Sequence, residues 1–351
     1  MKKTILTLYL SFTISICSFA QIGKSDLLGV WVNTKTDMKD GSKLIPIYPD
    51  YVNHFEITFL KNKFITDYYP SQSKLSSSNS YQLKNDLIES SINFGYEIEK
   101  LSNDTLIIVE KMNWLEDDQL KRFYMIKKEK LLALEKSKNY TNEHLIANPF
   151  YSPEFEGSIE LYLNNGLNKK YTNLKLKGKL NILLDDKKVD VAITHRDNND
   201  PKQEKTITKL LQKSFKKWNL DGFNEYSTIS IDFVIIMEKT KTYRGLRMGL
   251  NMNSFTQLLG LYGLTYKQLF DGNKIFNLGN ESFQLGNYED AINYYTESFE
   301  LNHTKVEALY NRASAYIKLE RYEQACSDWK KLKDLGQKQG EKLYHENCKQ
   351  Q

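Results

Sequence analysis

Two similar segments near the C-terminus, residues 272–305 and 306–338, decide how this chain is organised: they read GNKIFNLGNESFQLGNYEDAINYYTESFELNHTK and VEALYNRASAYIKLERYEQACSDWKKLKDLGQK. A repeat of this length is typical of a helix–turn–helix unit whose copies stack into a solenoid. The sequence therefore predicts a helical repeat module at this end. Three pairs of like residues lie 34 positions apart, namely Tyr288 and Tyr322, Ala291 and Ala325, and Leu301 and Leu335.

Small residues at similar places in the two copies support this register. Gly279 and Ala313 fall in the first helix of each copy, and Ala291 and Ala325 fall in the second. A small side chain lets two helices approach closely, whereas a larger one would push the pair apart. The predicted units of segment 272–351 are two repeats, 272–305 and 306–339, and a closing helix.

The pattern resembles the tetratricopeptide repeat, a family that binds protein segments more often than it catalyses reactions. In that family the first helix of each repeat lines a concave face, so the resemblance implies a binding groove there. Asn280 and Asn311 match the asparagines with which some members hold a peptide carboxylate, while Phe276 stands where those members have a lysine. We expect an aromatic and polar groove for a protein or peptide segment, lined by Asn273, Phe276, Asn280, Phe283, Gln284, Tyr310, Asn311, Ser314, Ile317 and Lys318.

An alternative for the same helices is that they pack against the protein's own middle domain. Two repeats are fewer than the roughly three that an array usually needs to stand alone. Cys326 and Cys348 both lie in this module, where they either form a disulfide that staples its end or remain buried free thiols. Pairing would require an oxidising compartment.

Residues 1–20, MKKTILTLYLSFTISICSFA, have the form of a signal peptide. Lys2 and Lys3 precede an apolar run, and small residues place the cleavage site before Gln21. Two alternatives are lipidation at Cys17 and an uncleaved anchor, although the run is shorter than the ~20 residues of a spanning helix. We expect an exported protein of a Gram-negative bacterium, in the periplasm, at the outer membrane or secreted, with no transmembrane segment after cleavage.

Residues 22–130 have the pattern of a β-domain, because short β-rich runs alternate with polar turns. Turns are expected at 40–42, 76–80 and 102–104. This spacing favours a small antiparallel barrel or sandwich. The expected strands are 28–33, 55–60, 87–93, 105–110 and 121–126.

The start of this domain, LLGVW at residues 27–31, resembles the Gly-x-Trp opening of lipocalin-like barrels. The resemblance implies that Trp31 closes the barrel floor and that Arg122 covers its indole ring in a cation–π contact. It also implies an alternative function, the carriage of a small apolar ligand. The other interpretation is a generic small β-domain whose Trp31 belongs to the core and whose interior its own side chains fill.

Residues 131–153 are predicted to form a linker and residues 154–240 an α+β domain, followed by connecting helices within 241–271. Alternation, turn signals and helical spacing define the elements of this domain. They are strands at 159–163 and 172–176, a hairpin at 180–184 and 189–194, a helix at 207–218 and a strand at 226–237.

Part of this domain, residues 178–237, resembles the C-terminal domain of TonB-like proteins. The resemblance rests on the hairpin, the helix ending at Trp218, Gly222 and the last strand. It implies a sheet edge where a peptide binds by strand addition. The alternative is a structural domain without a ligand of its own.

The sequence shows no catalytic or metal-binding motif. The five histidines are scattered, without the spacing of metal ligands. The formal net charge of +5, about +3 once Lys2 and Lys3 are removed, is nearly neutral for 351 residues and argues against nucleic acid as a partner. We expect a multidomain α+β chain that is not an enzyme, has no cofactor and binds a protein of the cell envelope. An enzyme whose catalytic groups meet only in the folded chain is the remaining alternative.

Overall fold

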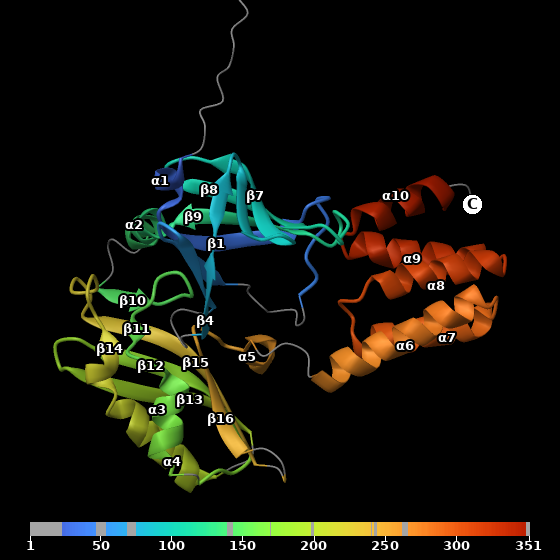
Figure 1. The fold of residues 1–351 in the computed structure, drawn as a ribbon. Coiled ribbons are helices and arrows are strands. Elements are labelled where there is room, and N and C mark those ends of the chain that lie inside the picture. The colour runs from blue at the N-terminus through green and yellow to red at the C-terminus, as the bar shows by residue number, and fades with distance from the viewer. Residues whose placement is uncertain are drawn as a thin grey trace, which may run out of the picture.

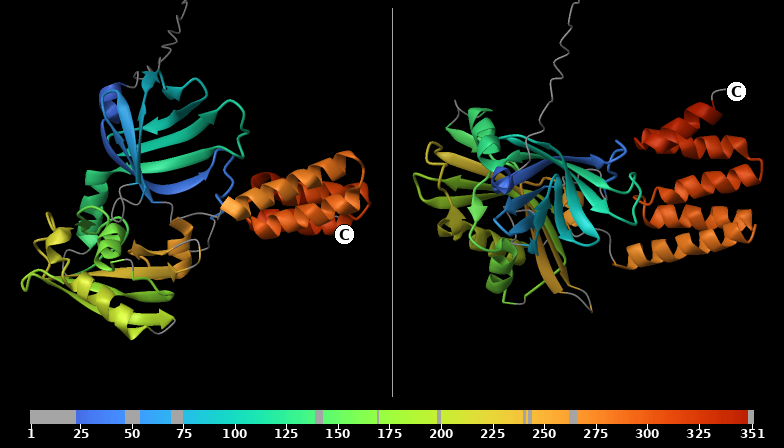
Figure 2. Two further views of the ribbon diagram at one scale, coloured as in Figure 1. Left: turned by 60° about the horizontal axis from the view of Figure 1, so that its bottom comes forward. Right: turned by 45° about the horizontal axis from the view of Figure 1, so that its top comes forward.

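The computed structural model divides the chain into three parts, coloured in Figure 1 from the N-terminus to the C-terminus. A β-domain lies above an α+β domain, and a stack of helices projects to one side (Figure 1, Figure 2). Residues 1–22, with the expected signal peptide and Cys17, lie outside the described residues. The structure describes residues 23–46, 54–68, 75–138, 143–168, 170–197, 200–239, 241, 244–261 and 266–348.

The β-domain is one antiparallel sheet of nine described strands in the order β4-β3-β2-β1-β9-β8-β7-β6-β5. The edge strands β4 and β5 are consecutive in the chain and only Tyr81 separates them. The sheet therefore curls until its edges nearly meet, which confirms the predicted antiparallel sheet as a nearly closed barrel. The strands are β1 (Gly29–Met38), β2 (Phe55–Phe59), β3 (Lys63–Tyr68), β4 (Leu75–Ser80), β5 (Gln82–Lys84), β6 (Leu87–Ser91), β7 (Phe94–Leu101), β8 (Thr105–Met112) and β9 (Lys121–Lys127), after the short helix α1 (Lys24–Leu27).

One of the predicted turns in this domain is wrong. The serine-rich residues 76–80 belong to β4, which pairs with β3 from Tyr68 opposite Leu75 to Lys63 opposite Ser80. Serine favours turns locally, but here the main-chain hydrogen bonds to β3 decide the conformation. Strands β3, β4, β5 and β7 were not predicted from the sequence, whereas all five expected strands are present.

The interior of the barrel is filled by aromatic and aliphatic side chains. Trp31 is fully buried, and its Nε1 donates a hydrogen bond to the Leu27 carbonyl oxygen at 2.7 Å. The Phe64 ring lies 5.8 Å from the Phe59 ring and 6.0 Å from the Tyr96 ring. These side chains occupy the space in which a carried ligand would lie. The buried core comprises Leu27, Trp31, Phe55, Ile57, Phe59, Phe64, Tyr81, Ile88, Ile98, Leu106, Ile108, Phe123 and Met125.

Arg122 does not cover Trp31, so this part of the lipocalin-like prediction is wrong. The pairing of β1 with β9 places Arg122 opposite Asp37 and Lys127 opposite Trp31. Lys127 Nζ accordingly lies 5.0 Å from the centre of the Trp31 ring. Arg122 instead donates to both carboxylate oxygens of Glu99, at 2.7 and 2.9 Å. Because of this strand register, the cation–π contact with Trp31 is made by Lys127, which lies further along β9.

The middle domain is a mixed sheet with β15 at its centre. β12 pairs along one side of β15 and β13 pairs with β12, while β10 and β16 share the other side of β15. The predicted order of hairpin, helix and strand is present as β12, β13, α4 and β15. The elements are β10 (His144–Ile146), β11 (Glu154–Phe155), α3 (Ile159–Gly166), β12 (Leu174–Leu183), β13 (Lys188–Asp197), α4 (Pro201–Gln212), the 3-10 helix Phe215–Lys217, β14 (Trp218–Asn219), β15 (Thr228–Lys239), β16 (Arg244–Leu250) and α5 (Phe255–Leu261).

Helices cover both faces of this sheet. On one face, α3 and α4 bury Leu163 and Leu211, which belong to the same core as Ile235 of β15. α5 covers the opposite face, where Leu258 packs with Ile236. Neighbouring residues of β15 thus belong to different cores, because successive side chains of a strand point to opposite faces of the sheet.

Two expectations for this region are wrong. Residues 159–163 begin helix α3 instead of a strand, because Ser158 Oγ accepts a hydrogen bond from the Leu161 amide at 3.2 Å and caps the helix. The connecting segment after residue 240 also contains a strand, β16, which extends the sheet. The predicted linker 131–153 holds most of α2 (Lys128–Lys138) and the strand β10.

The C-terminal part consists of five helices in the described residues, as the 34-residue period predicts. Gly279 lies against Tyr295, and a Cβ atom at Gly279 would come within 2.6 Å of that ring. Ala291, Ala313 and Ala325 are fully buried at the other helix contacts. The helices are α6 (Tyr266–Gln284), α7 (Tyr288–Leu301), α8 (Glu307–Lys318), α9 (Tyr322–Asp334) and α10 (Lys338–Asn347).

Replacing Ala291 with phenylalanine is expected to unfold the repeats. Ala291 has no exposed surface, and forcing a large side chain into a packed contact costs about 3 kcal/mol. Thermal melting followed by helical circular dichroism measures the effect. Asn293→Phe, at an exposed position of α7, is the control and should melt like the wild type. An unchanged melting curve for Ala291→Phe would show that the repeat register is wrong.

A partly buried ionic contact joins the β-domain to the middle domain. Lys128 Nζ donates to Glu56 of β2 at 3.0 Å and to Glu154 of β11 at 3.3 Å. His54 is 4% exposed, and its ring lies edge-on to Phe150 at 4.9 Å. Burial lowers the pKa of His54 to about 4, and burial raises the pKa of Glu56.

The substitution His54→Gln is expected to reduce the loss of stability on acidification. The unfolded chain protonates His54 near its ordinary pKa of 6.5, whereas the folded protein does so only near 4. Folding stability therefore falls as the pH drops through this window, by about 3 kcal/mol for this group. Chemical denaturation at pH 7 and pH 4 gives the two free energies of unfolding.

Glu56 acts in the opposite direction, because its raised pKa favours the folded protein as the pH falls. The test is therefore the difference between wild type and His54→Gln in the free energy of unfolding lost between pH 7 and pH 4. The pH dependence of either protein alone does not decide it. His195→Gln is the matched control, because His195 is half-exposed on β13. A His54→Gln protein that loses as much stability as the wild type between the two pH values would contradict the assignment.

Candidate functional site

The groove on the first helices of the two repeats contains a cavity of about 230 Å³. α6 and α8 supply most of its walls, as the repeat pattern predicts. Five of the ten predicted groove residues meet here, together with one residue from the second helix of the first repeat. The lining residues are Asn280, Phe283, Gln284, Asn311 and Ser314, and additionally Tyr295.

A hydrogen-bond network orients the two asparagines of this cavity. Asn280 Oδ1 accepts a bond from the Tyr295 hydroxyl at 2.9 Å and another from Asn311 Nδ2 at 3.0 Å. Burial raises the pKa of Tyr295, so its hydroxyl stays protonated and donates at neutral pH. These bonds engage the side-chain oxygen of Asn280 and the side-chain nitrogen of Asn311. The Asn280 amide group and the Asn311 oxygen can face a ligand.

Tyr295 was not among the predicted groove residues. It lies on the second helix, α7, which the repeat pattern assigns to the outer side. Its ring nevertheless reaches the groove because Gly279 has no side chain to block it. The signal for Tyr295 in the sequence is Gly279, because a helix without a side chain at that position leaves room for a ring from the next helix.

The other predicted groove residues divide between several environments. The Phe276 ring lies 5.7 Å from Tyr295, and Lys305 Nζ lies 4.4 Å from the centre of the Phe276 ring. A cation is thus present beside the phenylalanine that replaces the family's lysine. Ile317 packs into the core of the second repeat. The remaining residues are exposed Asn273 and Lys318, and Tyr310, whose hydroxyl accepts a bond from the Gly340 amide at 2.9 Å.

A second cavity, of about 830 Å³, lies between the repeats and the β-domain. Val306, Glu307 and Tyr310 of the repeats face β1 and the loop 43–46 across it. Charges of both signs line this cleft. Hydrogen bonds from Gln337 and Lys338 of the repeats go to Lys43 and Ser42 of the β-domain. The repeats therefore contact the β-domain, whereas the alternative prediction placed them against the middle domain.

A buried ion pair, which no sequence pattern revealed, ties the two repeats together. Arg312 of α8 donates to Asp328 of α9 through Nε at 2.9 Å and to Thr296 of α7 through Nη1 at 2.8 Å. Asp328 is 4% exposed. The hydrogen bond to Asp328 raises the pKa of Arg312. One guanidinium group therefore connects three helices below the groove.

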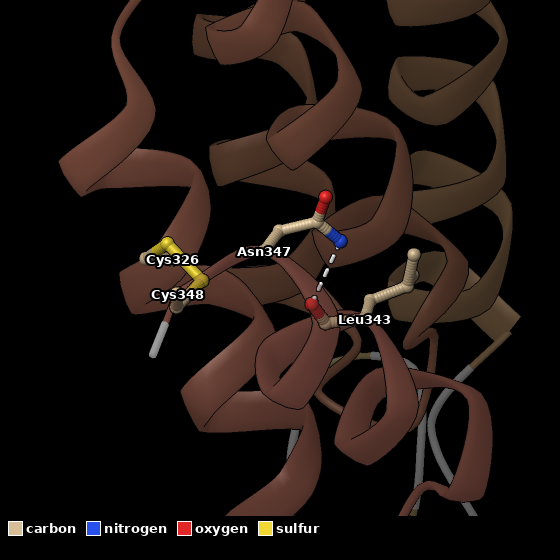
Figure 3. The surroundings of a disulfide bond; sticks show 4 residues. All are labelled: Cys326, Leu343, Asn347 and Cys348. Carbon is tan, nitrogen blue, oxygen red and sulfur yellow. Dashed lines mark hydrogen bonds between the residues drawn. A yellow bond between two sulfur atoms is a disulfide. The ribbon is translucent and has the colours of Figure 1, made fainter. Parts of the chain in front are cut away.

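Cys326 of α9 and Cys348 at the end of α10 form a disulfide bond. Figure 3 shows this bond beside the last turn of α10, where Asn347 Nδ2 donates to the Leu343 carbonyl oxygen at 2.9 Å. The bond closes a loop with a sequence separation of 22 residues. Of the two alternatives for these cysteines, the structure has the disulfide.

Metal ligands and membrane-spanning helices are the remaining features to consider. The described part of the chain shows no group of three or more His, Cys, Asp or Glu side chains placed to hold a metal ion. Among the described residues, no helix combines the length and the apolar character that a membrane span needs.

Known families match the repeat region. A model described as TPR repeat matches residues 279–320, and one described as tetratricopeptide repeat matches residues 306–335. The chain is also similar to sperm-associated antigen 1 of Mus musculus and of Rattus norvegicus, at 32% and 33% identity over 135 residues. Each match covers 38% of this chain, and the chain spans only 14% of the length of these curated relatives. The predicted tetratricopeptide repeats are thus confirmed.

Replacing Arg312 with alanine is expected to destabilise the repeats by about 3 kcal/mol, because it leaves Asp328 buried without its partner. Denaturation followed by circular dichroism measures the loss. Arg321→Ala is the matched control, because the Arg321–Glu289 pair is exposed and such pairs contribute under about 1 kcal/mol. Equal effects of the two substitutions would contradict the role given to Arg312.

Proposed function

We propose that this protein is a non-enzymatic scaffold that binds a segment of a partner protein in the groove of its tetratricopeptide repeats. The observation that supports this most is the cavity in which Tyr295, Asn280 and Asn311 are joined by hydrogen bonds. Polar groups that are already oriented lose little freedom on binding, which favours affinity. The contact of the repeats with the β-domain does not cover the groove, which therefore stays accessible.

The chemistry of the groove suits an extended polypeptide. A side-chain amide offers a donor and an acceptor, the same pair that a peptide group presents. Phe283 adds an aromatic surface beside the two asparagines. Lys305, above the Phe276 ring, supplies a positive charge near one end. We therefore assign to the groove a segment with accessible main-chain groups and an acidic residue or a terminal carboxylate.

We place the protein outside the cytoplasm, in the periplasm, at the outer membrane or in the secreted fraction of a Gram-negative bacterium. The signal-like pattern of residues 1–20 supports this. The Cys326–Cys348 disulfide supports it independently, because such bonds persist in oxidising compartments. The partner would then be another protein of the cell envelope.

The other two domains are proposed as supports of this scaffold. The barrel interior is packed with its own side chains, such as Trp31 and Phe64, which does not favour the carrier alternative. The order β12, β13, α4 and β15 supports kinship of the middle domain with the TonB C-terminal fold, and the Gly-x-Trp opening supports a lipocalin-like barrel. Both kinships are proposed for the fold alone.

Arginines introduced at Gln284 and Ser314 are expected to block the groove, because both residues are exposed and line its cavity. Immobilised full-length protein is incubated with envelope extract, and the retained proteins are identified by mass spectrometry. Capture of the partner should fall at least ten-fold in the double variant. The control is Asn293→Arg with Ser327→Arg, which places the same charges on exposed positions of α7 and α9. Equal capture by both double variants would remove the groove as the binding site.

A further inference from the structure

The repeats are joined to the β-domain by a small polar contact at the turn between α9 and α10. Gln337 Nε2 donates to the Lys43 carbonyl oxygen at 3.0 Å, and the Lys43 amide donates to the Gly336 carbonyl oxygen at 3.1 Å. The Lys338 amide donates to Ser42 Oγ at 2.9 Å. Ser42 is 1% exposed and Gln337 is 5% exposed, whereas Lys43 and Lys338 lie at the exposed rim of the contact. We call these bonds the docking contact.

The docking contact depends on the position of α10. Gln337 is the N-cap of this helix and Lys338 is its first residue. α10 has one fully buried residue, Gly340, which packs on Leu332 of α9, and its Leu343 and Tyr344 are partly buried against the core of the second repeat. A helix of ten residues is marginal by itself. The turn therefore depends on α10 staying packed on α9.

The disulfide is well placed to strengthen this packing, together with the apolar contacts of Leu343 and Tyr344. Cys348 is the C-cap of α10, at the end of the helix opposite to the docking contact, and Cys326 lies in α9. The bond, drawn in Figure 3, thus fixes the far end of α10. The near end of this helix makes the docking contact. Both cysteines are partly exposed, so a small thiol can reach them.

We propose that the Cys326–Cys348 bond is a redox switch that controls the docking of the repeats on the β-domain. A thiolate of a dithiol reductant attacks Sγ of Cys348, the sulfur–sulfur bond breaks, and Cys326 leaves as a thiolate that takes up a proton. The second thiol of the reductant then displaces Cys348, and the reductant becomes a disulfide. The protein gains two electrons and two protons.

Reduction frees the C-terminal end of α10 and with it the turn at Gly336–Lys338. The docking contact then opens, and the repeats lose their hold on Ser42 and Lys43. The cleft of about 830 Å³ has walls from both the repeats and the β-domain, so this movement widens it. The groove residues Asn280 and Asn311 belong to α6 and α8 and keep their network. The proposal therefore concerns regulation and does not rest on the proposed partner.

Hydrogen–deuterium exchange on the full-length protein tests the switch. The amides of Lys43 and Lys338 are followed in the oxidised protein, in protein reduced with dithiothreitol, and in the variant Cys326→Ser with Cys348→Ser. Both disulfide-free forms should exchange at these two amides at least ten-fold faster than the oxidised form. Protection of the α8 amides must stay unchanged, which shows that the repeats remain folded.

Two variants separate the switch from a general loosening. Gln337→Ala with Ser42→Ala removes two of the docking bonds, so it should expose Lys43 even with the disulfide intact, and dithiothreitol should add little. Ser327→Ala, next to Cys326, should behave like the wild type. Lys43 that stays protected in both disulfide-free forms while α10 exchanges rapidly would overturn the proposal. Loss of protection throughout α8 and α9 would overturn it as well, since the bond would then hold the fold rather than the docking.

Discussion

The close approach of α6 to α7 at Gly279 is the constraint on which the candidate site depends. Because Gly279 has no side chain, the Tyr295 ring lies directly against the backbone of α6. This position brings the Tyr295 hydroxyl to Asn280, and Asn280 in turn orients Asn311 of the next repeat. A packing requirement of the repeat thus sets the polar geometry of the groove.

The three parts of the chain are built with different kinds of interior. The barrel and the middle domain each have one large apolar core, whereas the repeats have two smaller apolar clusters together with the buried pair of Arg312 and Asp328. Such a pair is worth little against an apolar replacement but is costly to break. The joints between parts are polar too, at Lys128 and at the docking contact. Polar joints are specific without being strong, which suits parts that keep some independence.

The sequence predicted the structure best where one packing requirement, a small residue at each helix contact, recurs at a regular spacing. The spacing of Gly279, Ala291 and their equivalents gave the helices and half of the groove residues. It failed where a local pattern fits two structures: IELYL at 159–163 alternates like a strand, yet its buried ends also lie four residues apart, as on one face of a helix. Contacts between distant segments could not be predicted, since no local pattern indicates that Lys127 rather than Arg122 faces Trp31.

The pairing of β1 with β9 has a consequence for the way this protein acquires its structure. β1 can pair with β2, the next strand along the chain, but its second neighbour is the last strand, β9, and a loop that long makes closure of the barrel slow. Each helical hairpin, in contrast, is complete within a single 34-residue unit. The barrel, which is made first, is therefore expected to close more slowly than the helical hairpins form. Its exposed strand edges must stay apart from other chains during that interval.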